Sequence, residues 1–291
     1  MTAPDGDAVG DVAAADEPLA DAVRAADAAA RSAGIEIREV DDMAGHTAVD
    51  RLWTAVWGGS AMSAELLRAL AKAHNYVAAA YAGGRMVGAC AGFFHAPAER
   101  ALHSHVAGVS AEAAGRGVGF ALKLHQRVWA LERGLDAITW TYDPLIARNA
   151  HFNLTKLHAR PVEYLPNFYG AMPDAINRGD ESDRVLVRWD LRDPDVAAAC
   201  MGSRSARPAE EGGLRTVAVP ADIEALRTTD PAAARRWRAA VRDGLLPVLS
   251  GGGAVVGFGR DGYLVRTAAP TAPPGEPTSG PTSDPTTEET A

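Results

Sequence analysis

Three glycines at alternate positions constrain the fold of this chain more than any other feature. Gly115, Gly117 and Gly119 stand between an apolar stretch that ends at Val109 and a run of apolar residues with helical spacing. Glycine lets the backbone come close to an anion, and the free N–H groups in the first turn of a helix point at that anion along the helix dipole. The segment therefore predicts a strand, a phosphate-binding loop and a helix in direct succession.

Two common nucleotide-binding loops do not fit this spacing. A P-loop needs a Lys and then a Ser or Thr directly after its second conserved glycine, but Val118 and Phe120 follow the last two glycines here. A dinucleotide-binding loop needs Gly-x-Gly-x-x-Gly near the first strand, whereas these glycines come after several expected strands. A glycine-rich strand-to-helix turn without any ligand stays open as the alternative.

The periodicity of apolar residues on either side predicts a mixed α/β domain over residues 35–192. Before the glycines we expect a strand at 35–40, helices at 43–57 and 63–74, a hairpin of strands at 76–81 and 86–94, and a strand at 102–109. After them we expect a helix at 117–132, a strand at 137–142, a short helix at 149–157, and strands at 162–168 and 185–191. A chain of 291 residues has room for this domain and a smaller extension.

Composition changes on both sides of this domain. Residues 1–34 form an acidic, Ala-rich tail that we expect to be largely disordered, although its Ala content favours a helix at 18–33. Residues 193–266 predict a small α+β extension, with 194–213 as a loop, a strand at 214–219, helices at 222–226 and 232–242, and a hairpin at 257–265. Residues 267–291 are rich in Pro and Thr and predict a disordered tail.

Charge and apolar runs exclude several classes of partner. The formal charge of −8 lies in the two ends, because residues 1–34 hold seven acidic and two basic residues and residues 268–291 hold four acidic ones. The rest of the chain is close to neutral, so we expect no nucleic-acid partner. Apolar runs are too short for a membrane span and the first residues are acidic, so we expect a cytoplasmic protein without a membrane partner.

The cysteines and histidines show no metal-site spacing. Cys90 and Cys200 are too few for a disulfide framework or a Cys-based zinc site. Cys90 falls in an apolar stretch, where it predicts a small core residue. We therefore expect no metal, and a monomer or a homodimer.

The glycine loop and the order of elements together resemble the GNAT superfamily of N-acyltransferases. The loop of that family reads Arg or Gln, two residues, Gly, one residue, and Gly or Ala; Gly117 and Gly119 match its small positions, and Ala114 replaces the Arg or Gln. A further set of motifs resembles a little-studied bacterial branch of predicted GNAT acetyltransferases with a C-terminal extension: Asp143-Pro144-Leu145, Asn149-Ala150, Asn153, Lys156-Leu157 and Asn167-Phe168-Tyr169-Gly170, followed by Trp237-Arg238 in the extension. The resemblance implies an α/β fold with a mixed sheet, in which acetyl-CoA or another acyl-CoA lies between two parallel strands that separate. The residues it places against the acyl-CoA are Gly108, Val109, Ala114, Gly115, Arg116, Gly117, Val118, Gly119, Phe120 and Asn149. For Asn149, which would bind the pantetheine arm, a cap of the helix at 149–157 stays open as the alternative.

The same resemblance implies where the chemistry takes place. An amine attacks the thioester carbonyl, whose oxygen is held by a main-chain N–H near Gly108 and Val109. A base must take the proton of the amine, and the strand before the glycine loop offers His103 and His105, which face one side because they are two residues apart. Of these, His105 is the candidate base, with a partly buried histidine of no catalytic role as the alternative.

The usual general acid of the family is missing. A Tyr commonly stands two residues before the Lys of the helix at 149–157, and this chain has Leu154 there. Tyr169 is the candidate that replaces it, with Tyr164 nearby; either ring could instead be a packing aromatic. The third possibility is that the thiolate leaves unassisted, since a thiol is acidic enough to do so.

The predicted function is acyl transfer from acetyl- or succinyl-CoA to the amine of a small molecule, with an amino acid as one candidate acceptor. The carboxylate of such an acceptor could bind Arg148, Arg160 or Arg178. An inactive GNAT-like module that binds acyl-CoA as a sensor is the main alternative. Decarboxylation of an acyl-CoA on the same fold is a second one.

Overall fold

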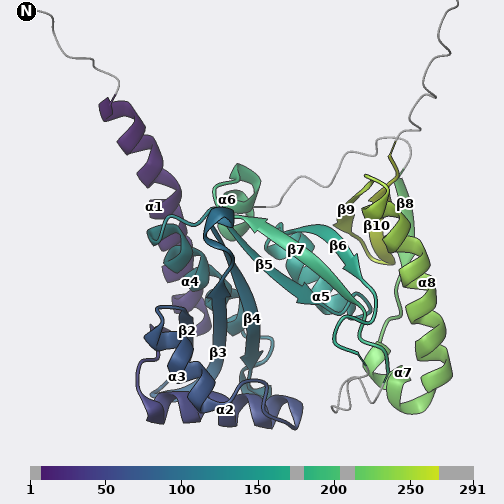
Figure 1. Ribbon diagram of the computed structural model, residues 1–291, viewed down its shortest axis with the longest axis horizontal. Helices are drawn as coiled ribbons and strands as arrows, with labels where there is room; N and C mark the ends of the chain where they lie inside the picture. The colour runs from purple at the N-terminus through teal and green to yellow at the C-terminus, as the bar shows by residue number, and fades with distance from the viewer. Residues whose placement is uncertain (1–7, 171–179, 204–213, 269–291) are drawn as a thin grey trace, which may run out of the picture.

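A seven-stranded mixed sheet forms the centre of the chain (Figure 1). The computed structural model describes residues 8–170, 180–203 and 214–268. The strands lie in the order β1-β2-β3-β4-β5-β7-β6, and every neighbouring pair is antiparallel except β4 and β5. Their bounds are Glu36–Glu39 (β1), Tyr76–Ala82 (β2), Arg85–Phe94 (β3), Ala101–Val109 (β4), Ala137–Tyr142 (β5), Arg160–Leu165 (β6) and Arg184–Asp190 (β7). The expected α/β fold with a mixed sheet is confirmed.

The parallel pair separates soon after it begins. The pairing of β4 with β5 covers only Ala101–His103 against Ala137–Thr139, although both strands continue. The register between β3 and β4 shifts so that Ala91 faces Val106 and Gly92 faces Ser104, which makes His105 the extra residue of a β-bulge. Because a bulge bends its strand and increases the twist, β4 turns away from β5 from this point on. The opening between the strands is the one that the resemblance implied.

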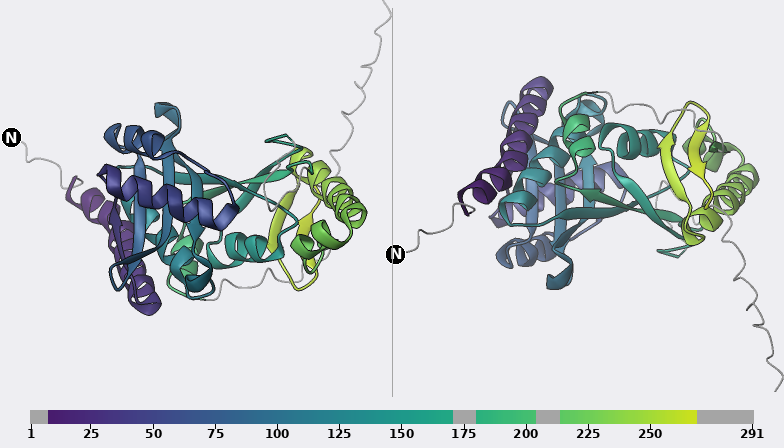
Figure 2. Two further views of the ribbon diagram at one scale, coloured as in Figure 1. Left: turned by 90° about the horizontal axis from the view of Figure 1, so that it is seen from below. Right: turned by 90° about the horizontal axis from the view of Figure 1, so that it is seen from above.

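Helices cover both faces of the sheet, which Figure 2 shows from two opposite directions. Helices α2 (Met43–Trp57) and α3 (Ala64–Lys72) pack on one face, and α1 (Ala8–Ala33) and α4 (Val118–Glu132) on the other. Strand β2 alternates between the two cores, since Tyr76 faces α4 and Val77 faces α2 and α3. Asp42 and Ser63 cap α2 and α3 by accepting backbone N–H bonds, as Ser63 was expected to do.

The N-terminal segment differs from the expected disordered tail. Its helix α1 lies along α4, and Ala22, Ala25 and Ala33 are buried in the core. The sequence offered few large apolar residues for docking. Alanine nevertheless has the highest helix propensity, and its short side chain lets two helices approach closely, so small residues suffice where a partner helix is present.

The C-terminal extension lies beside β6 at the far end of the sheet (green to yellow in Figure 1). It contains a three-stranded antiparallel sheet in the order β8-β10-β9, with bounds Leu214–Ala218 (β8), Ala254–Phe258 (β9) and Gly262–Arg266 (β10). Helices α7 (Ile223–Thr229) and α8 (Pro231–Ser250) accompany it, and α8 continues beyond the expected end at residue 242. The helix α6 (Pro194–Cys200), capped by Asp193, occupies part of the expected loop. The expected tail at 267–291 lies almost wholly outside the described residues.

The segment expected as a helix at 149–157 has two parts. The helix α5 (Ala147–His151) continues into a π-helical turn at Phe152–Lys156. Such turns widen the helix locally and are frequent at functional sites. Among the residues that the structure describes, no helix is both long and apolar enough to cross a bilayer.

Candidate active site

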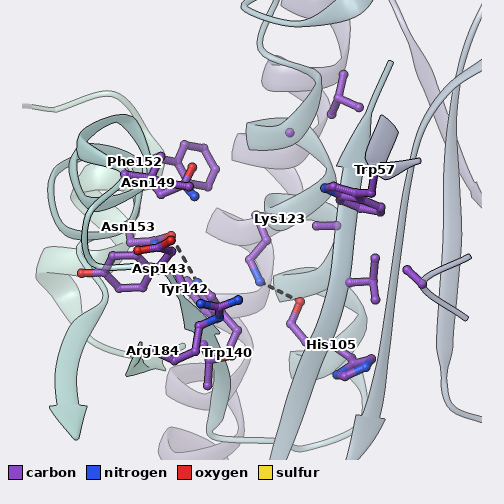
Figure 3. Close-up of a pocket in the computed structure, with 18 of the residues that line it drawn as sticks. Trp57, His105, Lys123, Trp140, Tyr142, Asp143, Asn149, Phe152, Asn153 and Arg184 are labelled. Atoms are coloured by element: carbon purple, nitrogen blue, oxygen red, sulfur yellow. Dashed lines mark hydrogen bonds between the residues drawn. The ribbon is translucent and has the colours of Figure 1, made fainter. Parts of the chain in front are cut away.

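A cavity of about 680 Å³ lies where β4 and β5 have separated (Figure 3). Val109 and Gly119 line it beside the glycine loop, and an ideal Cβ built on Gly119 would lie 3.8 Å from Val109. Ser104 lines the opposite end of the cavity, where the strands begin to separate, because it directly follows His103, the last residue of β4 that pairs with β5. The cavity therefore extends from the glycine loop to the end of the parallel pairing.

The glycine loop presents free backbone N–H groups at one end of this cavity. Gly115 and Gly117 have φ values of +77° and +85°, which only glycine adopts without strain. The first intrahelical bond of α4 runs from the Ala121 N–H to the Gly117 carbonyl. The N–H groups of residues 118–120 thus precede the first hydrogen-bonded turn and remain available to an anion.

The predicted acyl-CoA residues occupy different places around the cavity. Val109, Gly119 and Asn149 line it. The others in the loop and the first turn of α4, which are Ala114, Gly115, Arg116, Gly117, Val118 and Phe120, do not. Val118 is buried, so only its backbone could face a ligand. Gly108 is a packing residue, because a Cβ there would lie 2.6 Å from the Trp57 ring and 2.8 Å from the Trp53 ring.

The two strand histidines lie side by side, but only one faces the cavity. The rings of His103 and His105 are 5.7 Å apart, and both contact Phe93. His105 lines the cavity and is exposed, and desolvation lowers its pKa. Burial lowers the pKa of His103 further, to about 4. At neutral pH His105 is therefore unprotonated and able to accept a proton.

The two candidate tyrosines, Tyr169 and Tyr164, also differ in whether they face the cavity. Tyr169 lines the cavity with its hydroxyl 3.3 Å from the Thr141 hydroxyl, and its side chain is 43% exposed. Tyr164 is buried, and its hydroxyl donates to the Asp183 carboxylate at 2.6 Å. Leu154, at the usual position of the family's Tyr, is buried in the core. Only Tyr169 of these three residues faces the cavity.

The sequence reasoning missed Lys123, which lies deep in the cavity wall. Its side chain is 4% exposed and projects from α4 toward the gap between the strands (Figure 3). The ammonium donates to the Ser104 hydroxyl at 3.0 Å and to the Gln126 side-chain carbonyl at 2.8 Å, and it lies 3.7 Å from the centre of the Trp140 ring. Burial lowers its pKa to about 8. A Lys within an otherwise apolar helix face, in a chain with only three lysines, was the available signal.

Two of the three predicted carboxylate-binding arginines, Arg148 and Arg160, are described by the structure and do not line the cavity. Arg148 pairs with Glu224 of α7, and Arg160 pairs with Asp190 of β7. Arg178 lies outside the described residues. Arg184, at the start of β7, lines the cavity instead, with its guanidinium 5.4 Å from the Tyr169 ring.

The extension supports the far wall of the cavity from behind, although none of its described residues lines the cavity. Asp143, which follows β5 and lines the cavity, forms a buried 2.5 Å ion pair with Arg227 of α7. The hydroxyl of Tyr142 donates to Tyr263 of β10, which donates to the Pro144 carbonyl. The end of β5 is therefore held in place by residues more than 80 positions later in the chain.

The comparisons with known proteins found similarity to solved structures but not to known sequences. No known family and no curated protein matches the sequence. Among solved structures, the chain is similar to an N-acetyltransferase from Staphylococcus aureus Mu50 (16% identity, 54% of this chain and 98% of that one, TM-score 0.46). It is also similar to the ribosomal-protein-S18-alanine N-acetyltransferase from Escherichia coli (11%, 55% and 95%, TM-score 0.46) and to an aminoglycoside 6'-acetyltransferase type Ii (18%, 54% and 97%, TM-score 0.44). The strand order and the separation of β4 from β5 carry the assignment of the fold.

Proposed function

We propose that this protein transfers an acyl group from acyl-CoA to the amine of a small molecule. One observation carries the proposal: a single cavity follows the unpaired edge of β4 from Gly119, in the first turn of α4, to His105. An anion at the glycine loop and a nucleophile beside His105 would thus be connected by a strand edge that can hold an extended chain. This is the arrangement that a diphosphate-linked thioester requires.

Each part of the donor has a counterpart in the cavity. The diphosphate binds the N–H groups of residues 118–120, and the pantetheine arm follows β4 with Asn149 on its other side. The thioester oxygen is held by a main-chain N–H of β4 as charge develops on it. His105 takes the proton of the attacking amine, and Tyr169 orients the acceptor at the cavity entrance.

The charges of the cavity favour an acceptor with a carboxylate, such as an amino acid. Arg184 lines the cavity, and the carboxylate of Asp143 is paired with Arg227. Guanidinium groups bind carboxylates with two parallel hydrogen bonds. Acetyl-CoA and succinyl-CoA are the donors to compare.

The competing proposal is an acyl-CoA-binding module without turnover. The replacements at Ala114 and Leu154 favour it, since each removes a side chain that the family uses. The position of His105 argues against it, because it places a side chain that can accept a proton in the same cavity, on the unpaired edge of β4. Release of CoA thiol in the presence of an amine distinguishes the two.

Ligand-induced stabilisation tests the donor site. A ligand at 100 times its Kd stabilises by about 2.7 kcal/mol, so CoA, acetyl-CoA or succinyl-CoA should raise the Tm. Gly117→Val should abolish the shift, because its φ of +85° is strained for a β-branched residue. Gly134→Val is the matched control, since Gly134 has a φ of +68°, a Cβ there meets no atom within 4 Å, and it does not line the cavity. A wild-type protein that shows no shift with any of these compounds would rule out both the enzyme and the binding module.

A panel of amino acids and simple amines then tests turnover. Acyl transfer releases CoA thiol only when a suitable amine is present, and His105→Gln should lower that rate by about 100-fold or more. Thiol release without amine, accompanied by CO₂, would instead identify decarboxylation.

A further inference from the structure

Lys123 is a buried cation without an anionic partner. In the part of the chain that the structure describes, no carboxylate forms an ion pair with it. The groups that face its ammonium are His103 and Ser104 from β4, Cys90 from β3, Gln126 from α4, Trp140 from β5 and Trp189 from β7. Burying a charge is costly unless a partner compensates it. An anion that bound in the cavity beside the Lys123 ammonium would therefore be stabilised.

The length of the pantetheine arm brings the sulfur of acyl-CoA to this point. About 13 bonds join the nearer phosphorus to the sulfur, and an extended chain of that length spans about 15 Å at roughly 3.6 Å per three bonds. Gly119 of the phosphate loop lies beside Val109. The strand from Val109 to Ser104 covers about 16 Å at about 3.3 Å per residue. An arm that starts at the loop and follows β4 therefore ends near Ser104, whose hydroxyl contacts Lys123.

Among the described titratable side chains that line the cavity, no other is placed to give a proton to that sulfur. The hydroxyl of Tyr142 donates to Tyr263, and burial raises the pKa of Tyr142. Tyr169 lies at the entrance and is exposed. His105, as the base, must be unprotonated. Arg184 is a poor proton donor because a guanidinium stays protonated.

We propose that Lys123 is the general acid of the reaction and protonates the CoA thiolate as it leaves. The inference rests on the acyl transfer proposed above. The amine nitrogen bonds to the thioester carbon, and its proton passes to His105. The C–S bond then breaks, and the sulfur takes a proton from Nζ of Lys123. His105 afterwards releases its proton to water and Lys123 regains one, so that amide and CoA thiol are the only products.

The protonation states of the two groups suit these roles. Desolvation lowers the pKa of His105 below 6.5, and burial lowers the pKa of Lys123 to about 8. At neutral pH the base is therefore free and the acid still carries its proton. An ammonium whose pKa is close to that of a thiol, about 8.5, exchanges a proton with it at little cost. An Arg could not do so, because its pKa stays above 12.

Titration of bound CoA tests the inference without knowledge of the acceptor. The thiolate is followed by its ultraviolet absorbance in the CoA complex, with the desulfo-CoA complex as the blank. The wild-type protein should ionise the bound thiol at least about one pH unit below free CoA. Lys123→Met should shift it back to the value of free CoA or above, and Lys123→Gln, which keeps a polar group beside Ser104, should do the same. Lys156→Met is the matched control, because Lys156 is exposed and should leave the titration unchanged.

Kinetics with an acceptor found in the amine panel provide the second readout. Lys123→Met should lower kcat by about 10- to 100-fold, leave the KM for acetyl-CoA within about twofold, and remove the fall in rate above about pH 8. An equal thiol pKa in the wild-type protein and both variants would overturn the inference. So would a KM that rises for succinyl-CoA alone, since Lys123 would then bind an acyl carboxylate. If either of these results were found while desulfo-CoA still bound normally, the role of Lys123 would be refuted and the proposed acyl transfer would stand. If no CoA compound bound, the role of Lys123 and the proposed acyl transfer would both be refuted.

Discussion

The ion pair between Asp143 and Arg227 should be one of the strongest links between the extension and the sheet. The Asp143 and Arg227 side chains are 9% and 2% exposed and 2.5 Å apart. Two guanidinium nitrogens of Arg227 have no hydrogen-bond partner among the described residues, so the carboxylate is its principal compensation. Replacing one member of a buried pair typically costs 3–5 kcal/mol, because the other charge is left uncompensated.

We expect Arg227→Met to lower the free energy of unfolding by about 3 kcal/mol, at the lower end of that range. The reason is that Asp143 keeps one hydrogen bond, from the Leu145 N–H at 2.9 Å. For a chain of this size the loss corresponds to a fall in Tm of about 6–12 °C. Urea denaturation of the wild type, Arg227→Met, Asp143→Asn and the double variant would give the coupling energy, which should be about 2 kcal/mol.

A nearby exposed pair is the matched control. Arg148 of α5 lies a few positions after Asp143 and pairs with Glu224 of α7, the helix that carries Arg227, but the Arg148 and Glu224 side chains are 66% and 35% exposed. Arg148→Met should therefore cost no more than about 1 kcal/mol. Equal losses for Arg148→Met and Arg227→Met, or additive effects in the cycle, would refute the reasoning that burial makes the Asp143 pair strong.

Two further predictions concern packing and pH. Gly108→Ala should destabilise by about 1–3 kcal/mol in urea denaturation, because its Cβ would overlap the Trp53 and Trp57 rings; a loss no larger than that of Gly59→Ala would contradict this packing. The stability should fall as the pH drops from 6.5 to 4, because the unfolded His103 takes up a proton near pH 6.5 and the folded one only near pH 4. His103→Gln should reduce this part of the pH dependence, and an unchanged curve of unfolding free energy against pH would show that His103 is not its source.

Many secondary-structure elements of this protein could be predicted from its sequence, because they depend on local interactions. Apolar periodicity predicted each strand of the large sheet, and the capping role of Ser63 and the hairpin at Gly83 and Gly84 followed from their own neighbours. The glycine loop was equally local, since its positive φ values require glycine at Gly115 and Gly117. These features depend on residues only a few positions apart, so the sequence alone determines them.

Contacts between distant segments decided the rest. The docking of α1 depends on the surface of α4 nearly a hundred residues later, and the pairing of Asp143 with Arg227 spans 84 positions. In the sequence Lys123 is one residue of a predicted helix, and only the tertiary structure shows that its side chain lies between Ser104 and Trp140. Its burial and its altered pKa depend on the low-dielectric surroundings that four separate strands create. The sequence by itself determined the elements and the phosphate loop, whereas the tertiary structure decided which charged groups face the cavity, because burial and long-range pairing exist only in the folded chain.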